Sequence, residues 1–195
     1  PRDEAKRLVV GSPSQLIEID HYLFAGRRDW SQPFTALIAG GGTGDACIML
    51  AQHLADRDCP ATVHYLDLSQ AARAIAEARA RARNLTNIVF HTGSLLDISS
   101  LGIGKVDYID CTGVLHHLED PVAGWRILCS LLRPGGLMRI GLYSEQARRH
   151  VVRAREFIVA GGYPPTPEGI RACRAAILAR PDDALLARVA RGEDF

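Results

Sequence analysis

Residues 36–45 read Ala-Leu-Ile-Ala-Gly-Gly-Gly-Thr-Gly-Asp, a short apolar run followed by four glycines and an acidic residue. The apolar run predicts a buried strand, and the residues after it predict the start of a helix. Glycine allows the turn between them to be so tight that backbone amide groups can approach a ligand at the helix N-terminus. We therefore interpret this segment as a nucleotide-binding turn.

A second apolar run, at 62–69, contains Asp67 near its end. This acid follows the glycines by about twenty residues, which is the spacing expected of a carboxylate that binds ribose hydroxyls. The two segments together predict a cleft for a cofactor that contains adenosine.

Apolar, β-branched runs alternate with helical patterns along the middle of the chain. Because connections between parallel strands are right-handed, this alternation predicts a doubly wound α/β fold with a mainly parallel sheet. The helix at 120–132 begins at an Asp-Pro pair and stops at the Pro-Gly-Gly of 134–136. The predicted strands are 35–40, 62–68, 87–92, 106–112 and 137–143, and the other predicted helices are 44–56 and 70–83.

Length and composition favour one globular core rather than a charged or membrane-spanning chain. The 195 residues are 47% hydrophobic and carry a formal net charge of +1, so nothing global attracts the chain to nucleic acid or to a membrane. No apolar run approaches the roughly 18 residues of a membrane span. The five cysteines lack the spacing of a metal site, so we expect reduced thiols, no metal and a cytoplasmic location.

Five segments within residues 34–144 occur in an order that is typical of one enzyme family. They are the glycine turn at 40–44, Asp67 with Leu68, and residues 93–97, 108–121 and 132–137. In this order they resemble the motifs of class I S-adenosylmethionine-dependent methyltransferases, with a fourth-strand motif like that of members acting on small molecules. The resemblance implies a Rossmann-like fold and S-adenosylmethionine as the cofactor.

The resemblance also implies roles for individual residues. The glycine turn would lie against the methionine part of the cofactor, Asp67 would hold both ribose hydroxyls, and Leu68 would pack on adenine. Either Ser94 or Asp97 would meet the adenine amino group. Cys111, in a buried strand, is expected to be inert rather than nucleophilic. The implied cofactor-binding residues are Gly40, Gly41, Gly42, Gly44, Asp67, Leu68, Ser94, Leu95, Asp97, Cys111 and Tyr22.

Two positions depart from the family pattern. Ile38 stands where the family usually has an acid, two residues before the first glycine, so a contact to the amino end of the cofactor must come from elsewhere. Ser94 stands where an aspartate often meets adenine. A dinucleotide site would instead have a third glycine three positions after Gly42, where this chain has Asp45, whose charge would repel a pyrophosphate.

Candidates for chemistry at the acceptor follow the fourth and fifth strands. His117 could be a general base near neutral pH or could pack against the neighbouring helix. We expect His116 to cap the strand. Tyr143 could orient an acceptor or be an ordinary aromatic residue at the rim of the site.

The N-terminal segment, residues 1–33, is expected to form a cap on the core. Tyr22 could close on the methionine carboxylate, and Arg27 or Arg28 could pair with it; alternatively the segment is amphipathic and packs on the sheet. The first residue is Pro1, so we expect a processed chain or a piece of a longer one.

After residue 144 the chain shows helical patterns alone, at 147–158, 166–177 and 183–191. The family usually completes its sheet with an antiparallel hairpin, so the last strands are expected to be absent. The edge of the fifth strand would be unpaired, or covered by residues 145–195, a further domain or a partner. Between 148 and 191 the chain has nine arginines and four acids. Because no aromatic residues are interleaved with the arginines, we expect a solvated helix face and no binding of nucleic acid.

The motifs therefore predict a core at 1–144 that transfers a methyl group to a small-molecule acceptor, and a helical lid at 145–195 that selects this acceptor. Two alternatives from other classes stay open. One is a non-catalytic cofactor-binding or regulatory domain of a larger protein, and the other is an NAD-dependent oxidoreductase.

Overall fold

The computed structural model describes residues 16–192. Its chain divides into two compact units, Pro1–Leu142 and Tyr143–Phe195, which we describe separately. The division lies two residues before the predicted one at 144. The part of the predicted cap at 1–15 lies outside the described residues.

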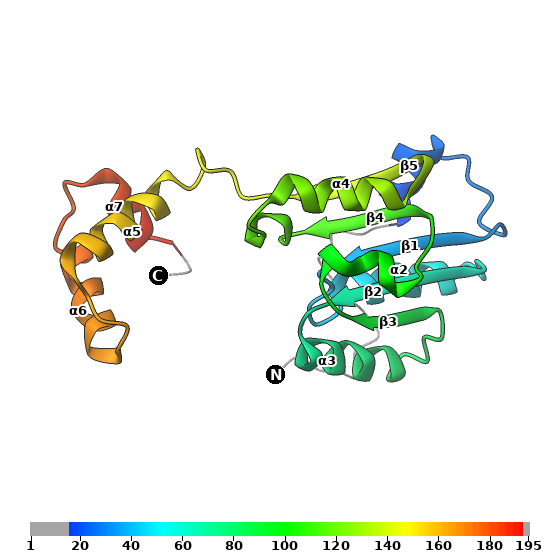
Figure 1. The fold of residues 1–195 in the computed structure, drawn as a ribbon, viewed down its shortest axis with the longest axis horizontal. Coiled ribbons are helices and arrows are strands. Elements are labelled where there is room, and N and C mark those ends of the chain that lie inside the picture. The colour runs from blue at the N-terminus through cyan, green and yellow to red at the C-terminus, as the bar shows by residue number, and fades with distance from the viewer. Residues whose placement is uncertain (1–15, 193–195) are drawn as a thin grey trace. The chain divides into compact units, whose positions relative to one another are not determined.

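The first unit is built on a parallel sheet with the strand order β3-β2-β1-β4-β5 (Figure 1). This arrangement confirms the predicted doubly wound α/β fold. The order reverses between β1 and β4, so a crevice is expected there at the carboxyl ends of the strands. The strands are β1 (Phe34–Ala39), β2 (Ala61–Asp67), β3 (Ile88–Thr92), β4 (Val106–Thr112) and β5 (Leu132–Gly141).

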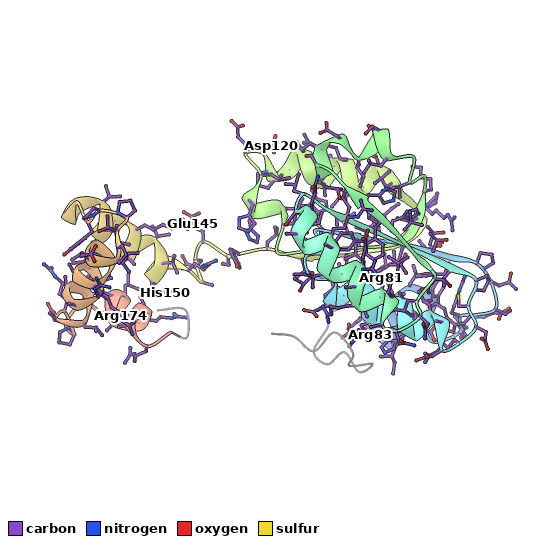
Figure 2. The ribbon with its side chains drawn as sticks, turned by 90° about the horizontal axis from the view of Figure 1, so that it is seen from below. Arg81, Arg83, Asp120, Glu145, His150 and Arg174 are labelled. Atoms are coloured by element: carbon purple, nitrogen blue, oxygen red, sulfur yellow. The ribbon has the colours of Figure 1, made fainter. Side chains whose placement is uncertain are left out.

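Both faces of the sheet are covered, and β1 shows this most clearly. Its alternate residues Ala36 and Ile38 belong to a core formed with α1 (Leu16–Phe24), α2 (Asp45–Ala55) and α3 (Gln70–Arg81). Leu37 and Ala39 face the opposite core, formed with the 3₁₀ helix η1 (Leu95–Leu101) and α4 (Pro121–Leu131). A strand buried on both faces explains the continuous apolar run before the glycines. Asp120 caps α4 (Figure 2).

The start of β5 differs from the prediction. Helix α4 ends at Leu131 and β5 begins at once, five residues earlier than the predicted strand at 137, and β5 ends at Gly141 rather than at 143. Val106 pairs with Leu132 and Tyr108 with Leu137, so β5 holds three more residues than β4 over this interval. The predicted Pro-Gly-Gly turn is therefore a bulge inside the strand, with Gly135 at φ +79°.

No further strand pairs with β5 within residues 16–192. None of the helices in this described range is both long enough and apolar enough to cross a membrane.

The second unit consists of helices, as the patterns after residue 144 predict. They are α5 (Arg149–Gly161), α6 (Pro167–Leu178) and α7 (Ala184–Ala190). A small core of Ala154, Cys173, Ile177 and Leu186 holds them together. Glu145, His150 and Arg174 are labelled on this unit in Figure 2.

A histidine pair on β2 and β3 makes stability depend on pH. Nδ1 of His64 lies 3.1 Å from Nε2 of His91, so one ring donates and the other must be neutral to accept. Burial lowers the pKa of both rings from the ordinary 6.5. The charge of His91 lowers the pKa of His64 further, and the charge of Arg73 lowers the pKa of His91 further. The unfolded chain therefore binds protons more readily than the folded one, and stability should fall as pH drops below about 6.5.

Urea unfolding at about pH 7.5 and 5.5 measures this loss. The variant His64→Gln, which leaves one titrating ring, should show a smaller difference between the two pH values. An equal difference in both proteins would contradict a role for the pair.

Candidate functional site

A cleft of about 310 Å³ opens at the carboxyl ends of β1, β2 and β4, where the strand order reverses. Residues from the glycine turn, from the end of β2 and from the segments after β3 and β4 surround it. The lining residues are Gly40, Leu66, Asp67, Leu68, Gly93, Ser94, Leu95, Thr112, Gly113, Val114, His117 and Leu118.

Neighbouring side chains pack closely against the glycine turn. Gly40 has φ +79°, and a β-carbon there would overlap the side chain of Val114. A β-carbon at Gly41 would overlap the ring of Tyr65, whose hydroxyl donates a hydrogen bond to the Gly42 carbonyl at 2.7 Å. Only glycine fits at the first two positions. Gly40 lines the cleft, whereas the other glycines of the turn, Gly41, Gly42 and Gly44, are not among the residues that line it.

The amide groups of the turn are hydrogen-bonded inside the protein. The N–H groups of Gly40 and Gly41 both donate to the Leu66 carbonyl, at 2.8 and 3.0 Å. The N–H of Gly42 donates to Oδ2 of Asp67 at 2.8 Å. These three amides therefore have partners within the protein, and their contact with a ligand stays a prediction. A pyrophosphate would find the amides engaged and a carboxylate beside them, which disfavours a dinucleotide.

Asp67 is held in place from both sides. Besides the Gly42 bond, its Oδ1 accepts a hydrogen bond from the N–H of Ser69 at 2.8 Å. Each carboxylate oxygen can accept two hydrogen bonds, so each keeps one position for a ligand. A fixed, partly exposed carboxylate with two open acceptor positions fits a pair of ribose hydroxyls.

The start of α2 is anchored to α3 by a buried arginine that the sequence interpretation missed. The Arg79 side chain donates to the Thr43 carbonyl and pairs with Oδ1 of Asp45 at 2.8 Å, and Arg79 is only 5% exposed. Asp45 thus has a partner within the protein. The available signal was an arginine between Ala76 and Ala80 on the buried face of α3.

Of the residues predicted to surround adenine, three line the cleft and one does not. Leu68, Ser94 and Leu95 line the cleft, and Leu68 is largely exposed. The Ser94 hydroxyl accepts a hydrogen bond from the N–H of Leu96 and so caps η1. Asp97 is exposed within η1 and is not among the residues that line the cleft.

His117 lines the cleft and is exposed, and its ring centroid lies 4.2 Å from that of His116. Cys111 is fully buried in the sheet below the cleft rather than on its wall. Burial, with the charge of Asp110, raises the pKa of the Cys111 thiol to about 12. The thiol is therefore protonated and part of the core packing.

Two predicted residues lie elsewhere. Tyr22 lines a second cavity of about 310 Å³ with Glu18 and Arg139, between α1 and β5. Tyr143 is the first residue of the second unit, and the guanidinium of Arg148 lies 3.8 Å from its ring centroid. Both remain predictions as functional residues.

The end of β4 and the segment after it hold cleft-lining residues to which the sequence interpretation gave no role. They are Thr112, Gly113, Val114 and Leu118. Their only signal in the sequence was their place directly after a predicted strand that ends beside the glycine turn.

Comparison with known proteins assigns the chain to a family. Residues 37–138, more than half of the chain, match the family model described as "Methyltransferase domain". The chain is 37% identical over 123 residues to an uncharacterized protein from Synechococcus sp., a match that covers 63% of the chain. The chain spans 28% of the length of that relative.

Solved structures share the fold. PKMT2 from Rickettsia typhi is 17% identical with a TM-score of 0.65, over 95% of this chain and 34% of that one. An arsenic (III) S-adenosylmethionine methyltransferase from Chlamydomonas reinhardtii is 18% identical with a TM-score of 0.52, over 78% and 55%. The family match at 37–138 includes both the glycine turn and Asp67. The chain therefore belongs to the methyltransferase domain family, the class I S-adenosylmethionine-dependent methyltransferases with a Rossmann-like fold.

Proposed function

We propose that the chain binds S-adenosylmethionine in the cleft beside the glycine turn and transfers its methyl group to a small-molecule acceptor. The observation that carries the proposal is the fixed Asp67 carboxylate, bonded to Gly42 and open toward the cleft. PKMT2 from Rickettsia typhi, which shares the fold, has been solved in complex with AdoHcy.

When bound, S-adenosylmethionine supplies an electrophilic methyl group on a positively charged sulfonium. The residues of this chain would bind, orient and exclude water. Asp67 accepts hydrogen bonds from ribose, while the exposed side chain of Leu68 offers an apolar surface to adenine. Val114 and Leu118 keep the β4 side of the cleft apolar. Such positioning is the main contribution that an enzyme makes to an in-line transfer.

Binding and transfer are tested separately. Calorimetry should show binding of S-adenosylhomocysteine and none of NAD. Methyl-labelled S-adenosylmethionine is then incubated with the protein and a cell extract, and mass spectrometry identifies labelled small molecules. Absence of S-adenosylhomocysteine binding would refute the cofactor site.

Two other functions give different results in these experiments. A non-catalytic or regulatory domain would bind S-adenosylhomocysteine but label no acceptor. An NAD-dependent oxidoreductase would bind NAD, which the engaged amides of the glycine turn disfavour.

The helical unit is proposed to select the acceptor as a lid. Its arginines are partly engaged with acids, as in the Arg153–Asp183 and Arg171–Glu168 pairs, which supports a solvated face rather than a nucleic-acid surface.

The five cysteines are all free, which fits a reducing, cytoplasmic environment. A further domain or a partner could cover the edge of β5.

His117 is proposed as the general base because it is the titratable side chain on the β4 wall of the cleft. His117→Ala should lower turnover by about a hundredfold while the affinity for S-adenosylhomocysteine stays nearly unchanged. The readouts are single-turnover kinetics with the identified acceptor and calorimetry. His53→Ala serves as the matched control, since His53 lies in the last turn of α2 and does not line the cleft. Parallel loss of cofactor affinity and thermal stability in His117→Ala would make the residue structural.

A further inference from the structure

A buried acid lies directly below the cleft. Among the described residues, Asp110 on β4 is the only buried carboxylate, with 2% exposure. It is the register partner of Ile38 on β1, two residues before the glycine turn. A buried charge is costly, so its position between these strands calls for an explanation.

Asp110 is connected to the cleft through one hydroxyl. The Thr112 hydroxyl donates a hydrogen bond to Oδ1 of Asp110 at 2.7 Å, and Thr112 lines the cleft. A carboxylate can only accept hydrogen bonds, and a hydroxyl has a single proton. With that proton committed to Asp110, the Thr112 oxygen can only accept a hydrogen bond from a group in the cleft.

The arrangement of strands indicates which part of the cofactor reaches Thr112. Asp67, at the end of β2, is proposed to hold ribose, and Leu68 and Ser94 on the same side are proposed to meet adenine. Thr112 lies across β1 from them, at the end of β4. A cofactor whose adenosine occupies the β2 side would therefore extend its amino-acid end toward β4.

We propose that Thr112 accepts a hydrogen bond from the α-ammonium group of the cofactor, and that Asp110 is the positioning residue that holds the hydroxyl for this contact. The inference rests on the proposed cofactor site. The pair supplies the negative charge and the acceptor that Ile38 lacks. A charge-assisted hydrogen bond of this kind is stronger than one between neutral groups.

The rival explanation is that Asp110 serves only the sheet. Arg139 on β5 is its register partner, and Tyr108 directs its hydroxyl toward Oδ2 at 3.5 Å. Arg139 also pairs with Glu18 on α1 at 3.1 Å. In this case replacement of Asp110 would lower stability and would affect every ligand of the cleft alike.

Calorimetry with two ligands separates the explanations. One ligand is S-adenosylhomocysteine, and the other is its analogue with hydrogen in place of the α-amino group. The variants are Thr112→Val, which keeps the shape and removes the hydroxyl, and Asp110→Asn. Thr112→Ser restores the hydroxyl, and Thr62→Val on β2, outside the cleft lining, is the matched control.

Thr112→Val and Asp110→Asn should each weaken binding of S-adenosylhomocysteine about tenfold, which corresponds to about 1.4 kcal/mol. Binding of the deaminated analogue should change less than about twofold, and Thr112→Ser and Thr62→Val should bind both ligands as the native chain does. Equal weakening for both ligands, or none in folded Thr112→Val, would overturn the proposal. If Asp110→Asn does not fold, Thr112→Val decides. Failure of the native chain to bind S-adenosylhomocysteine would instead refute the proposed function.

Discussion

Asp67→Ala should weaken binding of S-adenosylhomocysteine more than a hundredfold. The substitution removes two proposed hydrogen bonds to ribose, each worth about 1.5–3 kcal/mol because the acceptor is charged. It also removes the bond from the Gly42 amide, so the glycine turn loses one of its fixed points. Losses of roughly 3 kcal/mol or more correspond to more than a hundredfold in affinity.

Isothermal titration calorimetry measures this loss, with circular dichroism as a check of folding. Asp56→Ala is a suitable control, because Asp56 caps the far end of α2 and does not line the cleft. It should bind S-adenosylhomocysteine as tightly as the native chain does. If Asp67→Ala binds within about threefold of the native chain, the ribose assignment is wrong.

Gly40→Ala should destabilise the core by about 2–5 kcal/mol. Alanine at φ +79° is strained by roughly 1–2 kcal/mol. Its β-carbon would also overlap Val114, and overpacking of this kind costs about 1–3 kcal/mol. Because the turn and Val114 are both walls of the cleft, binding of S-adenosylhomocysteine should be lost as well.

Urea denaturation of three variants separates the strain from the overlap. Gly42 also has a positive φ, of +51°, but a β-carbon there would meet no atom within 4 Å. Gly42→Ala should therefore show the strain alone. Adding Val114→Ala to Gly40→Ala should recover part of the lost stability. If Gly40→Ala and Gly42→Ala are equally stable, the close approach of Val114 does not constrain the turn.

The core could be predicted because its signals are local. The apolar run of 36–39 is buried on both faces of the sheet, and this burial requires a continuous apolar sequence. The glycine turn follows β1 and Asp67 is the last residue of β2, and both strands end at the same edge of the sheet, so their spacing alone predicts a shared cleft. The helices after residue 144 likewise follow from apolar residues at helical spacing.

Contacts between distant segments had no such signal. Only the strand pairing shows that Asp110 lies beside Ile38. A one-residue change of register would move the Asp110 side chain to the other face of the sheet relative to its neighbours. The hydrogen bonds of Gly40 and Gly41 to the Leu66 carbonyl depend on how β1 and β2 are placed. The burial of Arg79 depends on how α3 packs against the glycine turn. These features arise from packing and register between segments, and the periodicity of one segment does not specify by itself which residue of another segment it meets.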